Sequence, residues 1–380
     1  MKQLWFAAPL LLSAAIITPA SAAAPQTISS PPRFFTVRIA PSSGALQRSH
    51  RRALSPAFAA TFTTIDVPGA GNASGQGTVA YAINSSGVIA GDFSDSAGNA
   101  YAFIRAPDGT FTAFGLYGGQ TLAYGINDKG AVSGTYLDPN TNNWRGYKRT
   151  PTGKFQTFDP SNDNGNGIFD PGINNGSTVV GDYTGTDGDY HSFFRSNNGT
   201  LTEFDAPGAT GTLAWGINKV GTISGSYDDL NGTHGYVRAT GGTFTEFDAP
   251  GAGGFGTIAD KLNNKGWVSG DYTDSSNVFH AYLRDPAGKF TEYDAPDAGN
   301  GYKQGTGGEG GINRNETVAA AYFDSSNVAH GYMRLKNGSL TEFDPPGSTW
   351  TETWDLNDSD VVVGDYIDSS GVYHGFIRTP

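Results

Sequence analysis

Charged side chains in one recurring segment of the chain are the residues best suited to chemistry. Seven times, a phrase close to Phe-Asp-x-Pro-Gly is followed by a short segment that leads into Gly-Ile-Asn or a close variant of it. In three of these segments the start is neutral, as in Leu213-Ala-Trp-Gly. The other four segments carry charged residues, which are Asp170, Asp260, Lys261, Glu309, Glu352 and Asp355.

Carboxyl groups that lie close together raise one another's pKa, which lets one serve as a general acid and another as a base. Asp170, Glu309 and Asp355 are therefore candidate catalytic residues for the hydrolysis or elimination of a glycosidic bond. The same acids could instead bind a cation or a basic ligand, or each could solvate its own loop. Asp260 and Lys261 are candidate ligand-binding residues. Three aromatic residues join them because their rings could stack on sugars: Tyr302, Trp350 and Trp354.

Five of the six histidines occupy one repeat position, and they are His191, His234, His280, His330 and His374. Equivalent positions on different repeats are spread apart, so we predict that each histidine bonds within its own unit instead of binding a metal. Its expected partner is the Asp of the Phe-Asp phrase, which is also a candidate partner for the arginine four residues after each histidine. Loops such as the one at Asp274 offer one carboxylate each, whereas calcium needs about six oxygen ligands. We predict Asx turns there and no metal or cofactor.

Familiar catalytic motifs are absent from the sequence. There is no cysteine, no Gly-x-Ser-x-Gly elbow, no phosphate loop and no His-Glu-x-x-His. Thiolate chemistry and disulfides are therefore excluded. The Asn that recurs before a tight turn in every unit is predicted to be structural. It occurs at Asn84, Asn127, Asn174, Asn218, Asn263, Asn313 and Asn357.

An internal repeat positions all of these residues. Its opening phrase begins at Phe62, Phe111, Phe155, Leu201, Phe244, Phe290 and Leu340. The period of roughly 46 residues is typical of propeller blades and other repeat arrays. Each unit has four short segments rich in aromatic and β-branched residues, separated by Gly, Asn and Asp turns. We therefore predict an all-β protein with four strands in each unit.

The phase of the repeat indicates a closed ring. The last unit ends at His374-Gly-Phe-Ile-Arg378 with no opening phrase after it, whereas residues 62–66 form an opening phrase with no unit before it. We predict that strand 62–66 completes the last blade of a seven-bladed β-propeller over residues 62–380. Closure would also leave no exposed inner edges. A β-solenoid is the alternative fold.

The fourth segment of the repeat resembles a known bacterial family. His280-Ala-Tyr, Tyr101-Ala-Phe and His374-Gly-Phe, each followed two residues later by Arg, are similar to the extracellular HAF repeat. The resemblance covers residues 62–380 and implies export and a propeller, but no catalytic residues. The second unit departs from the pattern, with Arg145 where most units have the histidine.

The N-terminal region predicts export. Residues 1–22 have the charge, apolar run and Ala20-Ser21-Ala22 site of a signal peptide, and residues 23–61 form a basic linker rich in Pro, Ser and Ala. We expect a secreted, periplasmic or cell-surface protein without a membrane span. Six of the 24 basic residues precede Phe62 whereas all 36 acidic residues follow it, so the repeat region carries a formal charge of −18. That charge disfavours nucleic acid as a partner.

Two functions fit these features. The first is a monomeric binding module whose top-face loops take a carbohydrate or an extracellular protein. The second is a carbohydrate-active enzyme, a hydrolase or a lyase, that uses the acids at the mouth of the central channel. The sequence favours the binding module, and a purely structural role in the envelope is a third alternative.

Overall fold

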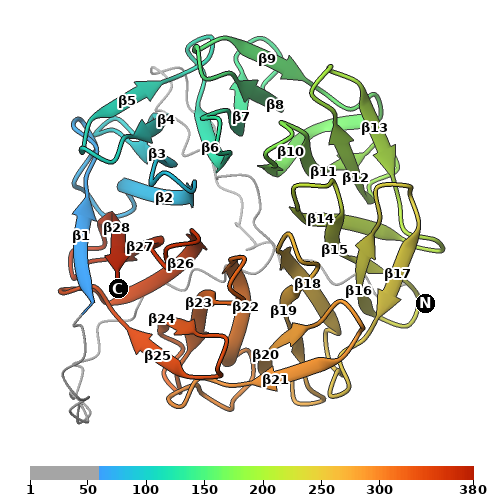
Figure 1. The fold of residues 1–380 in the computed structure, drawn as a ribbon. Coiled ribbons are helices and arrows are strands. Elements are labelled where there is room, and N and C mark those ends of the chain that lie inside the picture. The colour runs from blue at the N-terminus through green and yellow to red at the C-terminus, as the bar shows by residue number, and fades with distance from the viewer. Residues whose placement is uncertain (1–59) are drawn as a thin grey trace, which may run out of the picture.

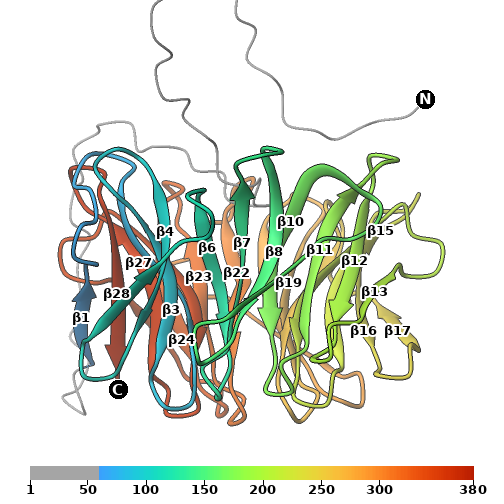
Figure 2. The same ribbon diagram turned by 90° about the horizontal axis from the view of Figure 1, so that it is seen from above.

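The computed structural model describes residues 60–380, which form strands and turns only. The predicted signal peptide lies outside the described residues, as does all of the predicted linker before residue 60. No helix within 60–380 is long and apolar enough to cross a bilayer. The strands radiate from a central axis and close into a ring, as Figure 1 shows face-on, and Figure 2 shows the same ring edge-on.

The ring is built from antiparallel meanders, each of four strands that run from the axis outward. The innermost strands are β2 (Gly77–Ile83), β6 (Thr121–Ile126), β10 (Asp163–Ile173), β14 (Gly211–Ile217), β18 (Thr257–Leu262), β22 (Gly305–Ile312) and β26 (Trp350–Leu356). The second strands are β3 (Ile89–Ser94), β7 (Val132–Asp138), β11 (Val179–Gly185), β15 (Ile223–Asp228), β19 (Val268–Thr273), β23 (Val318–Phe323) and β27 (Val362–Ile367).

The outer half of each meander follows the same order. The third strands are β4 (Ala100–Arg105), β8 (Asn143–Arg149), β12 (Tyr190–Arg195), β16 (Thr233–Arg238), β20 (Phe279–Arg284), β24 (Ala329–Arg334) and β28 (Tyr373–Thr379). The outermost strands are β5 (Phe111–Phe114), β9 (Phe155–Phe158), β13 (Leu201–Phe204), β17 (Phe244–Phe247), β21 (Phe290–Tyr293), β25 (Leu340–Phe343) and β1 (Thr61–Ile65). The opening phrase of each repeat is thus the outermost strand of the preceding meander.

Hydrogen bonding groups the described strands into three four-stranded and two eight-stranded sheets. The larger sheets arise because two meanders are joined by one parallel residue pair, Gly77 with Tyr373 in one case and Phe279 with Gly305 in the other. All other strand pairs are antiparallel, which excludes the parallel coils of a β-solenoid.

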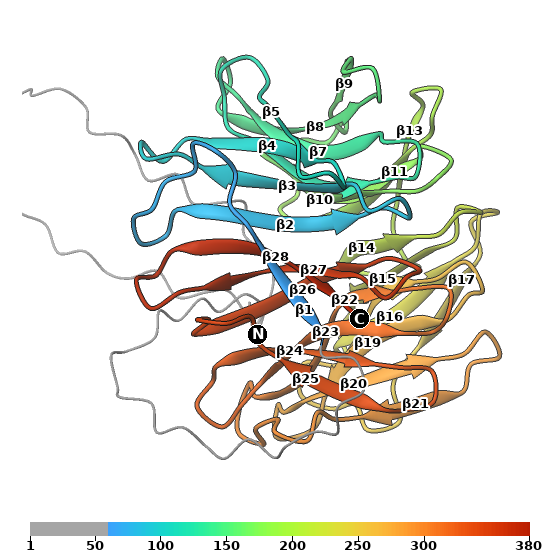
Figure 3. The same cartoon turned by 60° about the vertical axis from the view of Figure 1, so that its left-hand side comes forward.

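The first strand closes the ring. β1 pairs antiparallel with β28 from Thr61 opposite Thr379 to Ile65 opposite Gly375, and Figure 3 shows it lying beside that strand. The Phe62 ring packs 5.9 Å from Phe343 and 6.1 Å from Phe376, measured between ring centroids. The two ends of the described chain therefore share one sheet, which ties closure of the ring to both termini.

Aromatic side chains of the third strands fill the space between meanders. Tyr147, for example, is fully buried, and its hydroxyl donates a 2.9 Å hydrogen bond to the carbonyl oxygen of Leu122 on the innermost strand. The facing position on β7 must be glycine, because a Cβ on Gly134 would run into both the Leu122 carbonyl oxygen and the Tyr147 ring. Burial of such rings supplies most of the driving force for folding.

The repeated histidines stay within their own meander, as predicted. Nδ1 of His234 lies 2.8 Å from Asp248 of the Phe-Asp phrase, Nε2 lies 3.2 Å from Asp229 of the adjacent hairpin, and the imidazole lies on the Tyr227 ring. His374 makes the same bond to Asp66 across the closure, at 2.8 Å. The histidines are thus spread around the ring, and the described residues contain no group of His, Cys, Asp and Glu fit to hold a metal ion.

Two details differ from the expected pattern. Arg145 replaces the histidine in the second unit and still contacts two carboxylates, at 3.3 Å from Asp138 and 3.5 Å from Asp159. The repeated arginine does not follow the suggested pairing with Asp. Instead its guanidinium lies over an aromatic ring of the preceding meander, as Arg284 does at 4.3 Å from the centroid of Phe247.

Candidate functional site in the central channel

A β-bulge in every innermost strand shapes the channel. The pairing of each innermost strand with its neighbour shifts register a few residues before the repeated Asn. A bulge leaves its extra residue unpaired and re-aims its side chain. The residues skipped by the pairing include Tyr81, Tyr124, Asp170, Trp215, Asp260, Glu309 and Trp354.

These seven residues meet around one cavity of about 110 Å³, and Gly172, Lys261 and Gly310 complete its lining. One side of the cavity is aromatic. The ring centroid of Tyr81 lies 5.4 Å from those of both Tyr124 and Trp354. The indole nitrogen of Trp354 donates a 2.6 Å hydrogen bond to Asp365, and that of Trp215 donates a 3.1 Å bond to Ser226. Both indoles are therefore held in place by the second strand of their own meander.

Four charged residues also line the cavity, and they are Asp170, Asp260, Lys261 and Glu309. Asp260 is only 4% exposed, and its Oδ2 atom has no hydrogen-bond partner in the described residues. Lys261 directs its ammonium group to the carbonyl oxygen of Trp215, at 2.7 Å. Asp170 has a φ of 37°, in the left-handed region that costs a non-glycine residue roughly 1–3 kcal/mol. Strain and an unsatisfied buried carboxyl in one cavity are features of functional sites.

A second cavity of about 50 Å³ adjoins the first, and the two share Glu309 and Trp354 in their linings. Asp271, Glu352 and Thr353 also line it. The Oε2 atom of Glu352 and the Oγ1 atom of Thr353 are buried without a hydrogen-bond partner in the described residues. The channel thus contains several buried polar atoms that a ligand could satisfy.

Further carboxyl groups are buried on the second strands, close to the cavities. Burial raises the pKa of Asp182 well above its usual value, although its Oδ1 accepts a 3.2 Å bond from the amide of Ala214. Burial likewise raises the pKa of Asp271 to about 6, against the effect of a 2.7 Å bond from the amide of Gly308. Burial and then the charges of Asp271 and Glu309 raise the pKa of Asp260 well above its usual value. Both effects favour the protonated form of Asp260 over the ionised form.

The structure brings most of the sequence-predicted residues together. Asp170, Asp260, Lys261, Glu309 and Trp354 line the same cavity, although they lie along the innermost strands at the bulges and not at their starts.

The other three candidates are placed elsewhere. Asp355 accepts backbone hydrogen bonds of 3.0 Å from Ile83 of the neighbouring meander and 2.8 Å from Leu356. Its carboxylate therefore links two innermost strands. Trp350 is not in a loop but begins β26, where it is 9% exposed and donates a 2.9 Å bond to Glu352. Tyr302 is exposed and lines neither channel cavity.

Sequence reasoning missed three aromatic residues of the site, Tyr81, Tyr124 and Trp215. They recur at one repeat position, which favours a role in the core. The available signal was that the fifth unit has Asp260 at that same position. A position that alternates between aromatic and acidic residues is more typical of a ligand-lined surface than of a core.

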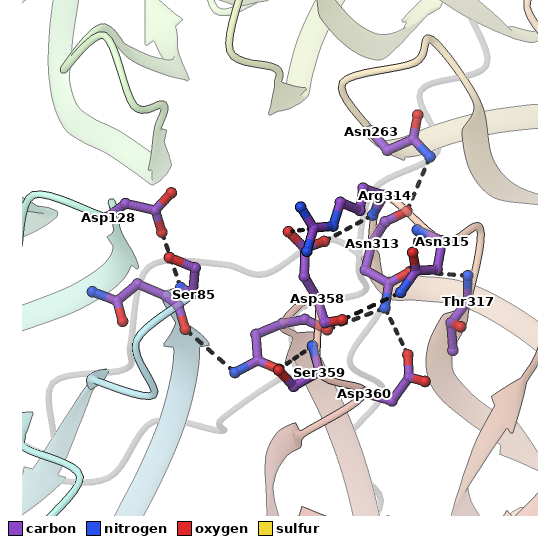
Figure 4. A network of polar contacts seen from close by, with 12 residues as sticks. Ser85, Asp128, Asn263, Asn313, Arg314, Asn315, Thr317, Asp358, Ser359 and Asp360 are labelled. Atoms are coloured by element: carbon purple, nitrogen blue, oxygen red, sulfur yellow. Dashed lines mark hydrogen bonds and ion pairs between the residues drawn. The ribbon is translucent and has the colours of Figure 1, made fainter.

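The repeated asparagines encircle the opposite end of the channel, and Figure 4 shows the part of this ring around Asn263 and Asn313. The side-chain nitrogen of each Asn donates to the backbone carbonyl oxygen of the Asn in the next unit, and the last bond, from Asn357 to Asn84, completes a ring of seven. The side-chain oxygen accepts turn amides, as Asn263 does from Lys265 at 2.9 Å and Trp267 at 3.1 Å. The cavity there, about 210 Å³, is lined by these asparagines, whose side chains already have partners, and also by charged residues that include Asp128, Lys219, Arg314 and Asp358. This ring is structural, as predicted for these residues.

Comparison with known proteins supports the architecture. No protein-family model and no curated protein matches the chain. Among solved structures, virginiamycin B lyase from Staphylococcus aureus is 13% identical with a TM-score of 0.56, over 84% of this chain and 100% of that one. The β-propeller domain of the Trilobed protease from Pyrococcus furiosus is 10% identical with a TM-score of 0.53, over 79% and 95%. At such identities the likeness shows the fold, which is a β-propeller.

Proposed function

We propose that this chain is an exported, seven-bladed propeller of the HAF-repeat type that acts as a binding module, and that its ligand is a small carbohydrate held in the channel cavity. The blade count is supported by seven four-stranded meanders and by the ring of seven asparagine bonds. Export rests on the signal-like residues 1–22. We favour the channel over the top-face loops as the ligand-binding site, because the polar and aromatic groups that converge on one cavity lie in the channel.

One observation carries the proposal: a single cavity has aromatic rings on one side and carboxyl groups on the other. Tyr81, Tyr124 and Trp354 present ring surface on which the apolar face of a sugar can stack. Asp170, Asp260 and Glu309 supply acceptors for its hydroxyl groups. A volume of about 110 Å³ is several times the roughly 10–15 Å³ that a cavity needs to hold one water molecule, so there is room for a ligand larger than water.

The proposal is tested by saturation-transfer NMR and calorimetry with a panel of monosaccharides. Tyr124→Ala should weaken binding at least about tenfold, since loss of one stacking ring in a desolvated site costs about 1.5 kcal/mol or more. Tyr302→Ala is the matched control, because Tyr302 is an exposed tyrosine away from the cavity. Binding that is lost in Tyr302→Ala and kept in Tyr124→Ala would move the site to the surface loops. No binding of any sugar by the wild-type chain would overturn the proposal.

Enzymatic hydrolysis or elimination is the second candidate. It is favoured by the pKa of Asp260, which burial and its acidic neighbours raise well above the usual value, as a general acid requires. Glu309 lines the same cavity and is the candidate partner. Mass spectrometry of oligosaccharides after incubation with the chain distinguishes the two functions. New products that disappear in Asp260→Asn and in Glu309→Gln would indicate an enzyme, whereas retention without products would indicate a binding module.

A further inference from the structure

We infer that the sugar bound in the channel carries a free, protonated amino group, as in a hexosamine, and that this ammonium group contacts Asp260. The inference rests on the proposed carbohydrate function and narrows the ligand to one chemical class. It depends on the charges around the cavity, on the unpaired atom of Asp260 and on the aromatic lining.

The charge of the cavity favours a cation. Asp170, Asp260 and Glu309 line it, against one ammonium group from Lys261. That ammonium donates to the Trp215 carbonyl oxygen at 2.7 Å. Further carboxyl groups stand behind this lining on the second strands, with Asp182, Asp271 and Asp365 all buried. Buried carboxyl groups that face one another destabilise their own ionised forms, and a bound cation relieves that repulsion.

Asp260 supplies the specific contact. It lines the cavity at 4% exposure, and its Oδ2 has no hydrogen-bond partner in the described residues. An ammonium group is the complement of such an atom, because it offers three donors, no acceptor and a positive charge. A neutral hydroxyl group offers one donor and leaves the repulsion among the carboxyl groups in place. The cavity should therefore prefer an amine to a hydroxyl group at this position.

The aromatic side of the cavity fits the same ligand. Tyr81, Tyr124 and Trp354 form a contiguous group of rings, which attract a cation held near their faces and also accept the C–H surface of a pyranose. A divalent metal ion is a poorer candidate, because no group of three or more metal-ligating side chains is suitably placed within residues 60–380. An organic cation with an apolar body matches the lining better.

The test compares D-glucosamine, D-glucose and N-acetyl-D-glucosamine by isothermal titration calorimetry on the purified chain. At a mildly acidic pH the amine of glucosamine is protonated. We expect glucosamine to bind at least about tenfold more tightly than the other two sugars, since a charge-assisted bond exceeds a neutral one by about 1.4 kcal/mol or more. Asp260→Asn should remove that preference, so that glucosamine and glucose bind the variant with affinities within about threefold of each other.

A measurement on the wild-type chain keeps the test valid if the variant does not fold. Because an ammonium group favours the ionised form of Asp260, glucosamine binding should release protons, seen as different heats in buffers of different ionisation enthalpy. Glucose binding should release none. Equal affinity for glucose and glucosamine, with no proton release, would overturn this inference and leave the carbohydrate function intact. If neither sugar binds, the carbohydrate function and this inference both fail.

Discussion

Replacement of Asn263 by alanine should destabilise the ring without touching the channel cavity. Asn263 is 5% exposed. Its side-chain oxygen accepts bonds from the amides of Lys265 and Trp267, and its nitrogen donates a 3.0 Å bond to the Asn313 carbonyl oxygen in the next unit. At about 1 kcal/mol for each bond, the loss is about 3 kcal/mol of unfolding free energy.

This loss translates into a measurable melting shift. Unfolding entropy of about 2.1 cal/mol/K per residue over about 320 residues gives about 0.7 kcal/mol/K, so Tm should fall by about 4 °C. Differential scanning calorimetry at one fixed scan rate measures the shift, because large domains often unfold irreversibly. Asn198→Ala is the control: Asn198 also caps a turn, with its oxygen 3.0 Å from the amide of Thr200, but it is exposed.

The comparison of the two variants decides the interpretation. Water can replace the lost bonds of Asn198, so its variant should melt within about 1 °C of the wild-type chain. If Asn263→Ala melts no lower than Asn198→Ala, then the buried asparagine bonds do not hold neighbouring units together. The role assigned to the ring would then be wrong.

Three further outcomes are expected. A chain that starts at Val67 lacks β1 and exposes the edge of β28, so in gel filtration it should associate where a chain that starts at Ala60 stays monomeric. Although burial alone lowers the pKa of His234, its hydrogen bond and charge contacts with Asp248 raise it above the usual value. An NMR titration of the His234 imidazole should show the raised pKa, and the pKa should be lower in Asp248→Asn. The pair's stabilisation should be complete below about pH 6.5 and disappear as pH rises through the raised pKa. Burial raises the pKa of Asp271 to about 6, so the native state holds an extra proton between about pH 4 and 6. Stability should therefore fall with rising pH across that range, and less so in Asp271→Asn, as followed by Tm.

The local structure of this protein was determined largely by the sequence. Opening phrases such as Phe244-Thr-Glu-Phe are strands because aromatic and β-branched residues alternate between turn residues. The phase of the repeat predicted that the first strand pairs with the last, and Thr61 does pair with Thr379. The turn bonds of Asn263 and the bond between His234 and Asp248 were also predictable, because each joins residues of one meander.

The candidate site depended on the tertiary structure. Tyr81, Asp170, Asp260 and Glu309 are separated by whole repeats, so nothing local relates them until the ring closes. The bulge in each innermost strand then decides which side chain faces the axis, and a period-two pattern cannot predict a shift of one residue. Asp355 illustrates this limit, because its carboxylate accepts a hydrogen bond from the Ile83 amide of a neighbouring meander. Local chemistry fixed the strands and turns, whereas convergence at the axis required closure of the whole ring.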